Sequence, residues 1–83
     1  MISIHRVFHK DRAAIRIDLT KEGAVGPKLL MELGRFAPTG AFLVAYSLDY
    51  EVDNNTSTLS VTLVGSFTDA DLAILQQVGD RAI

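Results

Sequence analysis

Hydrophobic and polar residues alternate from Ala41 to Phe67 with the period of two that is typical of β-strands. Two adjacent asparagines, Asn54 and Asn55, interrupt this alternation near its centre. Asparagine tolerates the positive φ that tight hairpin turns require. The pattern therefore predicts one long β-hairpin that turns at Asn54-Asn55.

This turn predicts a register in which one face of the hairpin is apolar along its length. On that face Phe42 meets Phe67, Val44 meets Gly65, Tyr46 meets Leu63, Leu48 meets Val61 and Tyr50 meets Leu59. The other face receives Leu43 with Ser66, Ala45 with Val64, Ser47 with Thr62, Asp49 with Ser60 and Glu51 with Thr58. A slip of one residue would exchange the two faces, so the pattern and the turn favour the same register. We expect the apolar face to point inward.

A second, shorter hairpin is predicted at the start of the chain. Apolar residues alternate on both sides of the segment Lys10-Asp11-Arg12: Ile2, Ile4 and Phe8 before it, and Ile15, Ile17 and Leu19 after it. The turn lacks Gly and Asn, so closure at Lys10-Asp11 and closure at Asp11-Arg12 both remain open. Arg6 is the one member of the inward row that is not apolar.

One helix is predicted after each hairpin. The first spans about 26–35, with Thr20 as a candidate cap, Pro27 in the first turn and an apolar stripe of Leu29, Leu30, Leu33 and Phe36. Gly34 is interpreted as a C-terminal cap or a point of close packing, and a turn follows at 37–40. The second begins after the cap Thr68 and has Asp69 and Asp71 in its first turn. Its inward face is predicted to hold Leu72, Leu75, Val78 and Ala82, with Ile74 beside them.

The predicted order is ββαββα, which is an α+β fold. A four-stranded antiparallel sheet with both helices packed on one face would bury all the apolar stripes. We expect a single domain over 1–83, with pseudo-repeat halves 1–36 and 41–83 that share shape but no clear sequence identity. The order of the strands in the sheet stays open.

Composition narrows the possible functions. The 83 residues include no cysteine, which excludes disulfides, thiolate metal sites and cysteine nucleophiles. No apolar run has the roughly 18–20 residues that span a bilayer, and Met1-Ile2-Ser3 does not resemble a signal peptide, so we expect a cytoplasmic protein without membrane contact.

Charge is distributed unevenly along the chain. Residues 1–36 hold seven Lys/Arg against four acids, net +3, and residues 37–83 hold one against six, net −5. This polarity can steer a charged partner or favour head-to-tail association, and it can equally arise by chance on a solvated surface.

Motifs for catalysis or cofactor binding are weak. His5 and His9 are predicted on a strand, roughly 13 Å apart, so they do not form a metal pair. Asp49-x-Glu51-x-Asp53 begins like a calcium loop but lacks the required Gly and final Glu. The segment 23–28 has two glycines before a helix without the spacing of a phosphate-binding loop. We therefore predict no cofactor, no metal and no enzymatic activity.

The tip of the long hairpin, 48–60, is the sharpest candidate for partner binding. Strands of about twelve residues would reach near 40 Å, farther than the first hairpin, so the tip is expected to overhang the sheet as an arm. We assign partner binding to residues that alternate across it: Asp49, Tyr50, Glu51, Asp53, Thr58 and Ser60. Tyrosine beside acids suits a basic groove on a larger protein. The alternative is a solvated edge whose charges discourage sheet aggregation.

The outer face of the sheet is a second candidate. Small apolar residues are predicted toward one end of it: Ala41, Leu43, Ala45 and Val64, with Val7 and Ala14 on the neighbouring hairpin. An apolar zone beside a polar one suits self-association, and the mean hydropathy of +0.24 favours a homodimer. The alternative is a surface of scattered small apolar residues.

The leading functional hypothesis is a non-enzymatic protein-binding module that blocks a surface of a larger protein or complex. In size and character, though through no motif, the chain is similar to the small inhibitors of phages and mobile elements, including anti-CRISPR proteins. One alternative is a nucleic-acid-associated regulator that uses the basic first half, with Arg6, Arg12, Arg16, Lys21 and Lys28. Another is a structural subunit of a larger assembly. The main hypothesis involves nucleic acid only indirectly.

Overall fold

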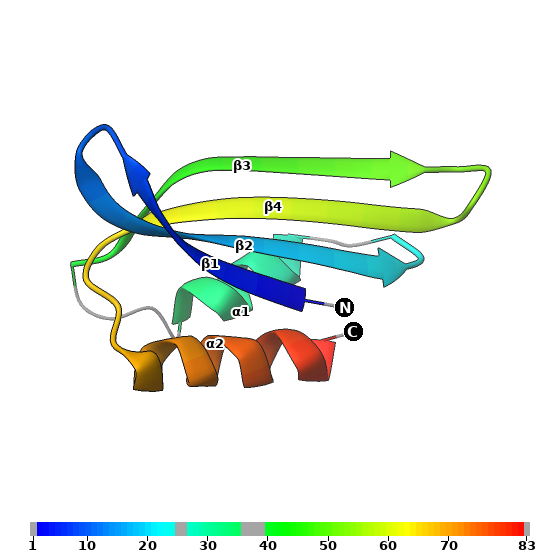
Figure 1. The fold of residues 1–83 in the computed structure, drawn as a ribbon. Coiled ribbons are helices and arrows are strands. Elements are labelled where there is room, and N and C mark those ends of the chain that lie inside the picture. Colours follow the sequence, from blue (N-terminus) through cyan, green and yellow to red (C-terminus); the bar gives the residue numbers. More distant parts are fainter. Residues whose placement is uncertain (1, 25–26, 36–39, 83) are drawn as a thin grey trace.

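The predicted order of two hairpins, each followed by a helix, is confirmed. The computed structural model describes residues 2–24, 27–35 and 40–82, without the side chains of residues 27, 30 and 82. Its elements are β1 (Ile2–His9), β2 (Arg12–Glu22), α1 (Pro27–Arg35), β3 (Phe42–Glu51), β4 (Thr56–Val64) and α2 (Asp69–Ala82). The four strands form one antiparallel sheet, and both helices lie on the same side of it (Figure 1).

The strand order is β1-β2-β4-β3, so the two hairpins lie side by side. β2 and β4 form the centre of the sheet, and β1 and β3 form its edges. β2 pairs with β4 from Ala14 opposite Val64 to Glu22 opposite Thr56. In Figure 1, β3 is the strand farthest from α2.

The first hairpin closes at Lys10-Asp11. Both residues have positive φ, 49° and 66°, and His9 pairs with Arg12 across the turn. Two successive residues with positive φ give the turn whose twist matches that of the adjoining strands. Of the two closures left open by the sequence, this one is correct.

The second hairpin turns over four residues, Val52 to Asn55, because Glu51 pairs with Thr56. The predicted two-residue turn at Asn54-Asn55 is therefore wrong, and each β3 residue from Ala45 to Glu51 pairs two positions earlier on β4 than expected. Tyr46, for example, pairs with Val61. A shift of two residues preserves the side to which each side chain points, so the predicted division into faces holds for this part of the hairpin.

At the start of β3, a β-bulge reverses the side of the sheet to which each residue points. The register shifts between Leu43 and Ala45, which leaves Val44 as the extra residue. Phe42 consequently pairs with Val64 on the outer face, and Leu43 pairs with Leu63 on the helix side. The predicted pairing of Phe42 with Phe67 is wrong, since Phe67 follows β4 and packs in the core.

The core lies between the two central strands and the helices. Alternate residues of β2 and β4 point toward the helices and are almost fully buried: Ile15, Ile17, Leu19, Leu59, Val61 and Leu63. Leu29 and Leu33 from α1, Leu75 from α2, and Ile2 and Phe67 complete the same cluster. The predicted inward residues of β1, β2 and α2 are thus largely confirmed, apart from Phe8 and Ile74, which are exposed, and the side chain of Ala82 lies outside the described part of the chain.

The start of α2 follows the predicted capping pattern. The backbone N–H of Asp71 donates to Thr68 Oγ1 at 3.1 Å, and the N–H of Thr68 donates to Asp71 Oδ2 at 2.9 Å. The predicted cap of the first helix is wrong, because β2 extends to Glu22 and includes Thr20. The predicted inward Phe36 and the turn residues 37–39 lie outside the described residues.

Gly34 has neither of its predicted roles. It lies inside α1 without a positive φ, and a Cβ added to it would meet no atom within 4 Å. We expect Gly34→Ala to raise the free energy of unfolding by about 0.5–1 kcal/mol, because alanine loses less backbone entropy than glycine in a helix. Urea unfolding followed by circular dichroism measures this change. A destabilised variant would show that the Gly34 backbone is not helical in solution.

Candidate functional site

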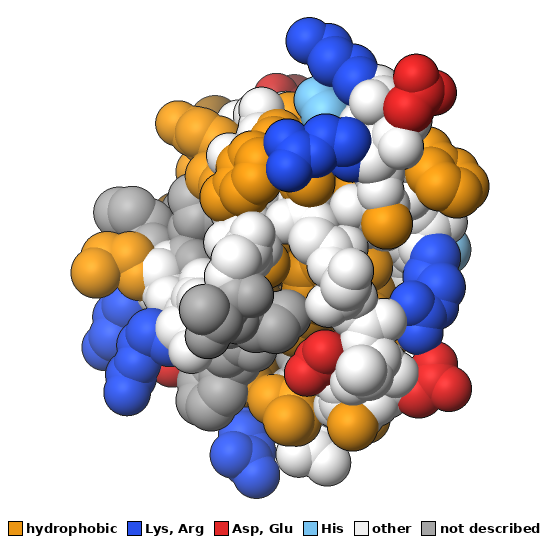
Figure 2. Space-filling view, turned by 90° about the vertical axis from the view of Figure 1, so that its left-hand side faces the viewer, with side chains coloured by type: hydrophobic (Ala, Val, Ile, Leu, Met, Phe, Trp, Pro, Cys, Tyr) orange, Lys and Arg blue, Asp and Glu red, His pale blue; other side chains and the backbone are white. Residues whose placement is uncertain are grey.

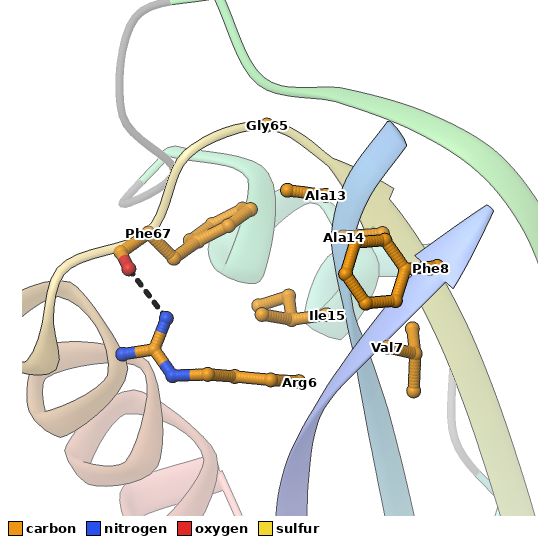
Figure 3. Close-up of a pocket in the computed structure, with 8 residues that line it drawn as sticks. All are labelled: Arg6, Val7, Phe8, Ala13, Ala14, Ile15, Gly65 and Phe67. Carbon is orange, nitrogen blue, oxygen red and sulfur yellow. Dashed lines mark hydrogen bonds between the residues drawn. The ribbon is translucent and has the colours of Figure 1, made fainter. Parts of the chain in front are cut away.

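The first hollow of the surface lies at the turn end of the first hairpin. Its volume is about 260 Å³, and it is lined by Arg6, Val7, Phe8, Ala13, Ala14, Ile15, Gly65 and Phe67 (Figure 3). Figure 2 looks onto this end of the molecule and shows exposed hydrophobic side chains beside Lys and Arg.

Arg6 supplies the charge in this hollow, but its guanidinium is already engaged. Nη1 donates to the carbonyl oxygen of Phe67 at 2.7 Å, and Nη2 donates to Asp69 Oδ1 at 2.7 Å. Figure 3 shows the Arg6 side chain reaching toward Phe67, with Ile15 between the two. These bonds connect β1 to the segment that leads into α2. Arg6 therefore has a structural role here, which explains a charged residue in an otherwise apolar row.

The stronger candidate is an apolar row on β3 that the helices leave uncovered. Tyr46, Leu48 and Tyr50 point to the helix side, as predicted, yet their exposed fractions are 62%, 44% and 47%. The β4 residues opposite the first two, Val61 and Leu59, are only 1% and 3% exposed. The expectation that the whole apolar face is buried is therefore correct for β4 and wrong for β3.

The row continues toward α1 as a second hollow. This hollow has a volume of about 270 Å³ and is lined by Met31, Leu33, Gly34, Ala41, Phe42, Leu43, Val61 and Leu63. Met31 and Leu43 are themselves exposed, at its rim. We call Leu43, Tyr46, Leu48 and Tyr50 the β3 row. Together with Met31 it forms an apolar surface beside α1.

The acids of the hairpin lie on the opposite side of β3. Asp49 and Glu51 point to the outer face with Thr58 and Ser60 of β4, whereas Asp53 belongs to the turn. The structure thus places the tyrosine and the acids of the predicted partner-binding set on different sides, as the alternation indicated. Within the described residues, no cation pairs with Asp49 or Glu51.

The tip of the hairpin is tied to its surroundings, and only its turn, 52–55, extends beyond the end of β2 (Figure 1). β4 pairs with β2 as far as Thr56, and the N–H of Gly23 donates to the carbonyl of Asn55 at 2.7 Å. The Tyr50 hydroxyl donates to Asn55 Oδ1 at 2.6 Å, and Asn54 Nδ2 donates to Glu51 Oε1 at 2.8 Å. The predicted arm is wrong because β2 has 11 residues and is longer than expected.

The predicted self-association set is not one surface. The bulge puts Leu43 on the helix side, while Ala45 remains exposed on the outer face. Val64 faces outward as predicted but is only 2% exposed, since it lies between Ala14 and Phe42. The guanidinium of Arg12 lies 5.0 Å from the centre of the Phe42 ring and covers this corner.

The five basic residues of the nucleic-acid alternative are dispersed. Arg12 and Arg16 lie on the outer face, Arg6 and Lys21 on the helix side, and Lys28 on α1. Arg16 pairs with Asp18 at 3.0 Å, which leaves its charge partly neutralised. The structure does not bring these residues together into a single basic patch.

Two features are absent from the described residues: a group of metal ligands and a membrane-spanning helix. In the ranges 2–24, 27–35 and 40–82, no three His, Cys, Asp or Glu side chains are grouped so that they could hold a metal ion. His5 lies on β1 opposite Arg16, and His9 lies opposite Arg12 at the turn. Among the same residues, neither helix has the length and apolar character needed to cross a membrane.

The exposed β3 row could have been found from the lengths of the predicted elements. A helix of about ten residues is near 15 Å long, whereas a strand of ten residues is near 33 Å. The first helix therefore cannot cover the distal half of the long hairpin.

No protein-family model matches the chain, no curated protein matches it in sequence, and no solved structure matches its fold.

Proposed function

We propose that the protein is a non-enzymatic protein-binding module that uses the β3 row to occlude a surface of a larger protein. The observation that supports this proposal is the exposure of Tyr46, Leu48 and Tyr50 on the helix side of the sheet, where the β4 residues opposite them, Val61, Leu59 and Ser57, are buried. Tyrosines and adjoining aliphatic side chains on a rigid strand are typical anchors of protein interfaces. Because these side chains are already held in a row, binding costs little ordering entropy.

The charge of the neighbouring residues indicates the character of the partner. Asp49 and Glu51 lie on the other side of β3 from the row, Asp53 lies in the turn, and none of the three carries a cationic partner within the described residues. Acids on the same edge strand as an apolar row favour a basic surface on the other protein and accelerate its association. In this proposal the module acts in the cytoplasm as an inhibitor that blocks a basic groove, in keeping with its similarity in size and character to small phage and mobile-element inhibitors.

A capture experiment with matched variants tests the proposal. The immobilised chain is incubated with extract of its native host, and the bound protein is identified and then purified. We expect Tyr46→Ser/Leu48→Ser to lower the affinity for that protein by at least about tenfold, the effect of removing interface anchors. Ile74→Ser is the control, because Ile74 is exposed to a similar extent but lies on α2. Equal binding by both variants, with both folded, would contradict the proposal.

A further inference from the structure

β3 has an open main-chain edge next to the β3 row. It lies at the border of the sheet, and among the described residues β4 is its one strand partner. Nine of its ten residues are exposed, with Val44 at the bulge as the exception. In an edge strand, alternate N–H and C=O groups point away from the sheet without a partner. β3 therefore offers hydrogen-bonding groups as well as side chains.

The two sides of this edge differ in chemistry. Toward the helices the strand presents Tyr46, Leu48 and Tyr50. Toward the outer face it presents Ser47, Asp49 and Glu51, and no Lys or Arg occurs between Phe42 and Glu51. A strand added to this edge would place its own side chains alternately on the same two sides. Apolar residues would complete the β3 row, and basic residues would neutralise the acids.

Resting on the proposed function, we propose that β3 binds its partner by strand addition, and that the added segment alternates apolar residues with Lys or Arg. Main-chain hydrogen bonds supply affinity in this mode, and alternate side chains supply selectivity. A second copy of the chain fits less well at this edge. Its own β3 would bring another Asp49 and Glu51 and no cation, so the acidic side would stay unneutralised.

Synthetic peptides test the chemistry of the added segment. The probe is an eight-residue capped peptide in which Val and Lys alternate, labelled for fluorescence anisotropy, and the control carries Glu in place of Lys. We expect the Lys peptide to bind at least about tenfold more tightly. In Asp49→Lys/Glu51→Lys the preference should reverse. In Glu22→Lys, an exposed outer-face change on β2, it should persist. Equal affinity of both peptides for the unaltered chain would overturn the proposal.

N-methylation of the peptide tests the main-chain bonds. Alternate residues of a strand direct their N–H groups to opposite edges, and only one edge of the peptide faces β3. Methylating one set of alternate residues should abolish binding, and methylating the other set should leave it within about twofold. Equal effects of the two methylations, whether both peptides bind or neither does, would overturn strand addition.

The outcomes separate this inference from the proposed function. Binding of the captured partner can depend on Tyr46 and Leu48 while methylation of either set of alternate peptide residues has the same effect. In that case strand addition is wrong, and the module still binds protein. If capture is unaffected by those residues, the proposed function itself fails. Analytical ultracentrifugation of the free chain tests for a second copy at the β3 edge. If the chain is a dimer and Ser47→Pro dissociates it, a second copy occupies this edge. That result would also overturn the inference.

Discussion

Replacing Leu59 by alanine is expected to lower the free energy of unfolding by about 3 kcal/mol, as for buried leucines in general. The same substitution at Leu48 should cost less than about 1 kcal/mol, because a half-exposed side chain leaves no cavity and loses little burial. The two leucines pair directly across β3 and β4 and point to the same side of the sheet. They differ in burial: Leu59 is 3% exposed and Leu48 is 44% exposed.

Urea unfolding of the two variants at equal protein concentration measures this difference. The residue type, the strand pair and the face are the same, so the intrinsic hydrophobicity of the side chain cancels in the comparison. Equal losses of stability would mean that Leu48 is covered in solution, by a second copy or by another part of the chain. The β3 row would then not be available to a partner.

Gly65→Ala is expected to destabilise the protein by about 2–4 kcal/mol, through backbone strain and crowding together. Gly65 has a φ of +156°, and a Cβ added to it would lie 3.0 Å from the Cβ of Ala41 and 3.1 Å from its Cα. Its N–H also donates to the carbonyl of Ala13 at 3.0 Å, so the backbone cannot easily move away. The change therefore strains the point where β4 ends beside the start of β3.

Gly23→Ala is the matched control for this prediction. Gly23 has a φ of +86°, but nothing lies within 4 Å of an added Cβ, so backbone strain acts alone. We expect a loss of about 1–2 kcal/mol for that variant. Thermal unfolding by calorimetry compares the two. A Gly65 variant as stable as the Gly23 variant would show that Ala41 does not constrain this junction.

Much of the fold is predictable from the sequence because each element carries several agreeing signals. The second helix has an apolar stripe, a cap and acids in its first turn, and the structure contains all three. The division of each strand into two faces was also predictable, since the side-chain period of a strand is two. The pairing register was not, because a slip of two residues leaves every face unchanged, and only the turn distinguishes the two registers. Asn54-Asn55 satisfied the local rule for a two-residue turn, but the chain uses four residues.

Most residues of the candidate site were predictable from the sequence, but the face and the exposure of several of them were not. Tyr50, Asp49 and Glu51 were identified from alternation alone, and the structure puts the tyrosine and the acids on opposite sides as expected. The bulge at Val44 carries no clear sequence signal, so the change of face at Leu43 was missed. The exposure of Tyr46 and Leu48 depends on where the helices lie along the sheet, which is set by tertiary packing rather than by the pattern of the strand.

The accessibility of the leucine methyl groups tests the central claim most directly. A soluble, uncharged gadolinium chelate enhances the relaxation of methyl groups that solvent reaches. Methyl NMR on the free chain measures this enhancement for each leucine. We predict strong enhancement for Leu48 and little for Leu59, and protection of Leu48 once the captured partner is added. If Leu48 is as well protected as Leu59 in the free chain, or remains unprotected in the complex, the β3 row is not the binding surface.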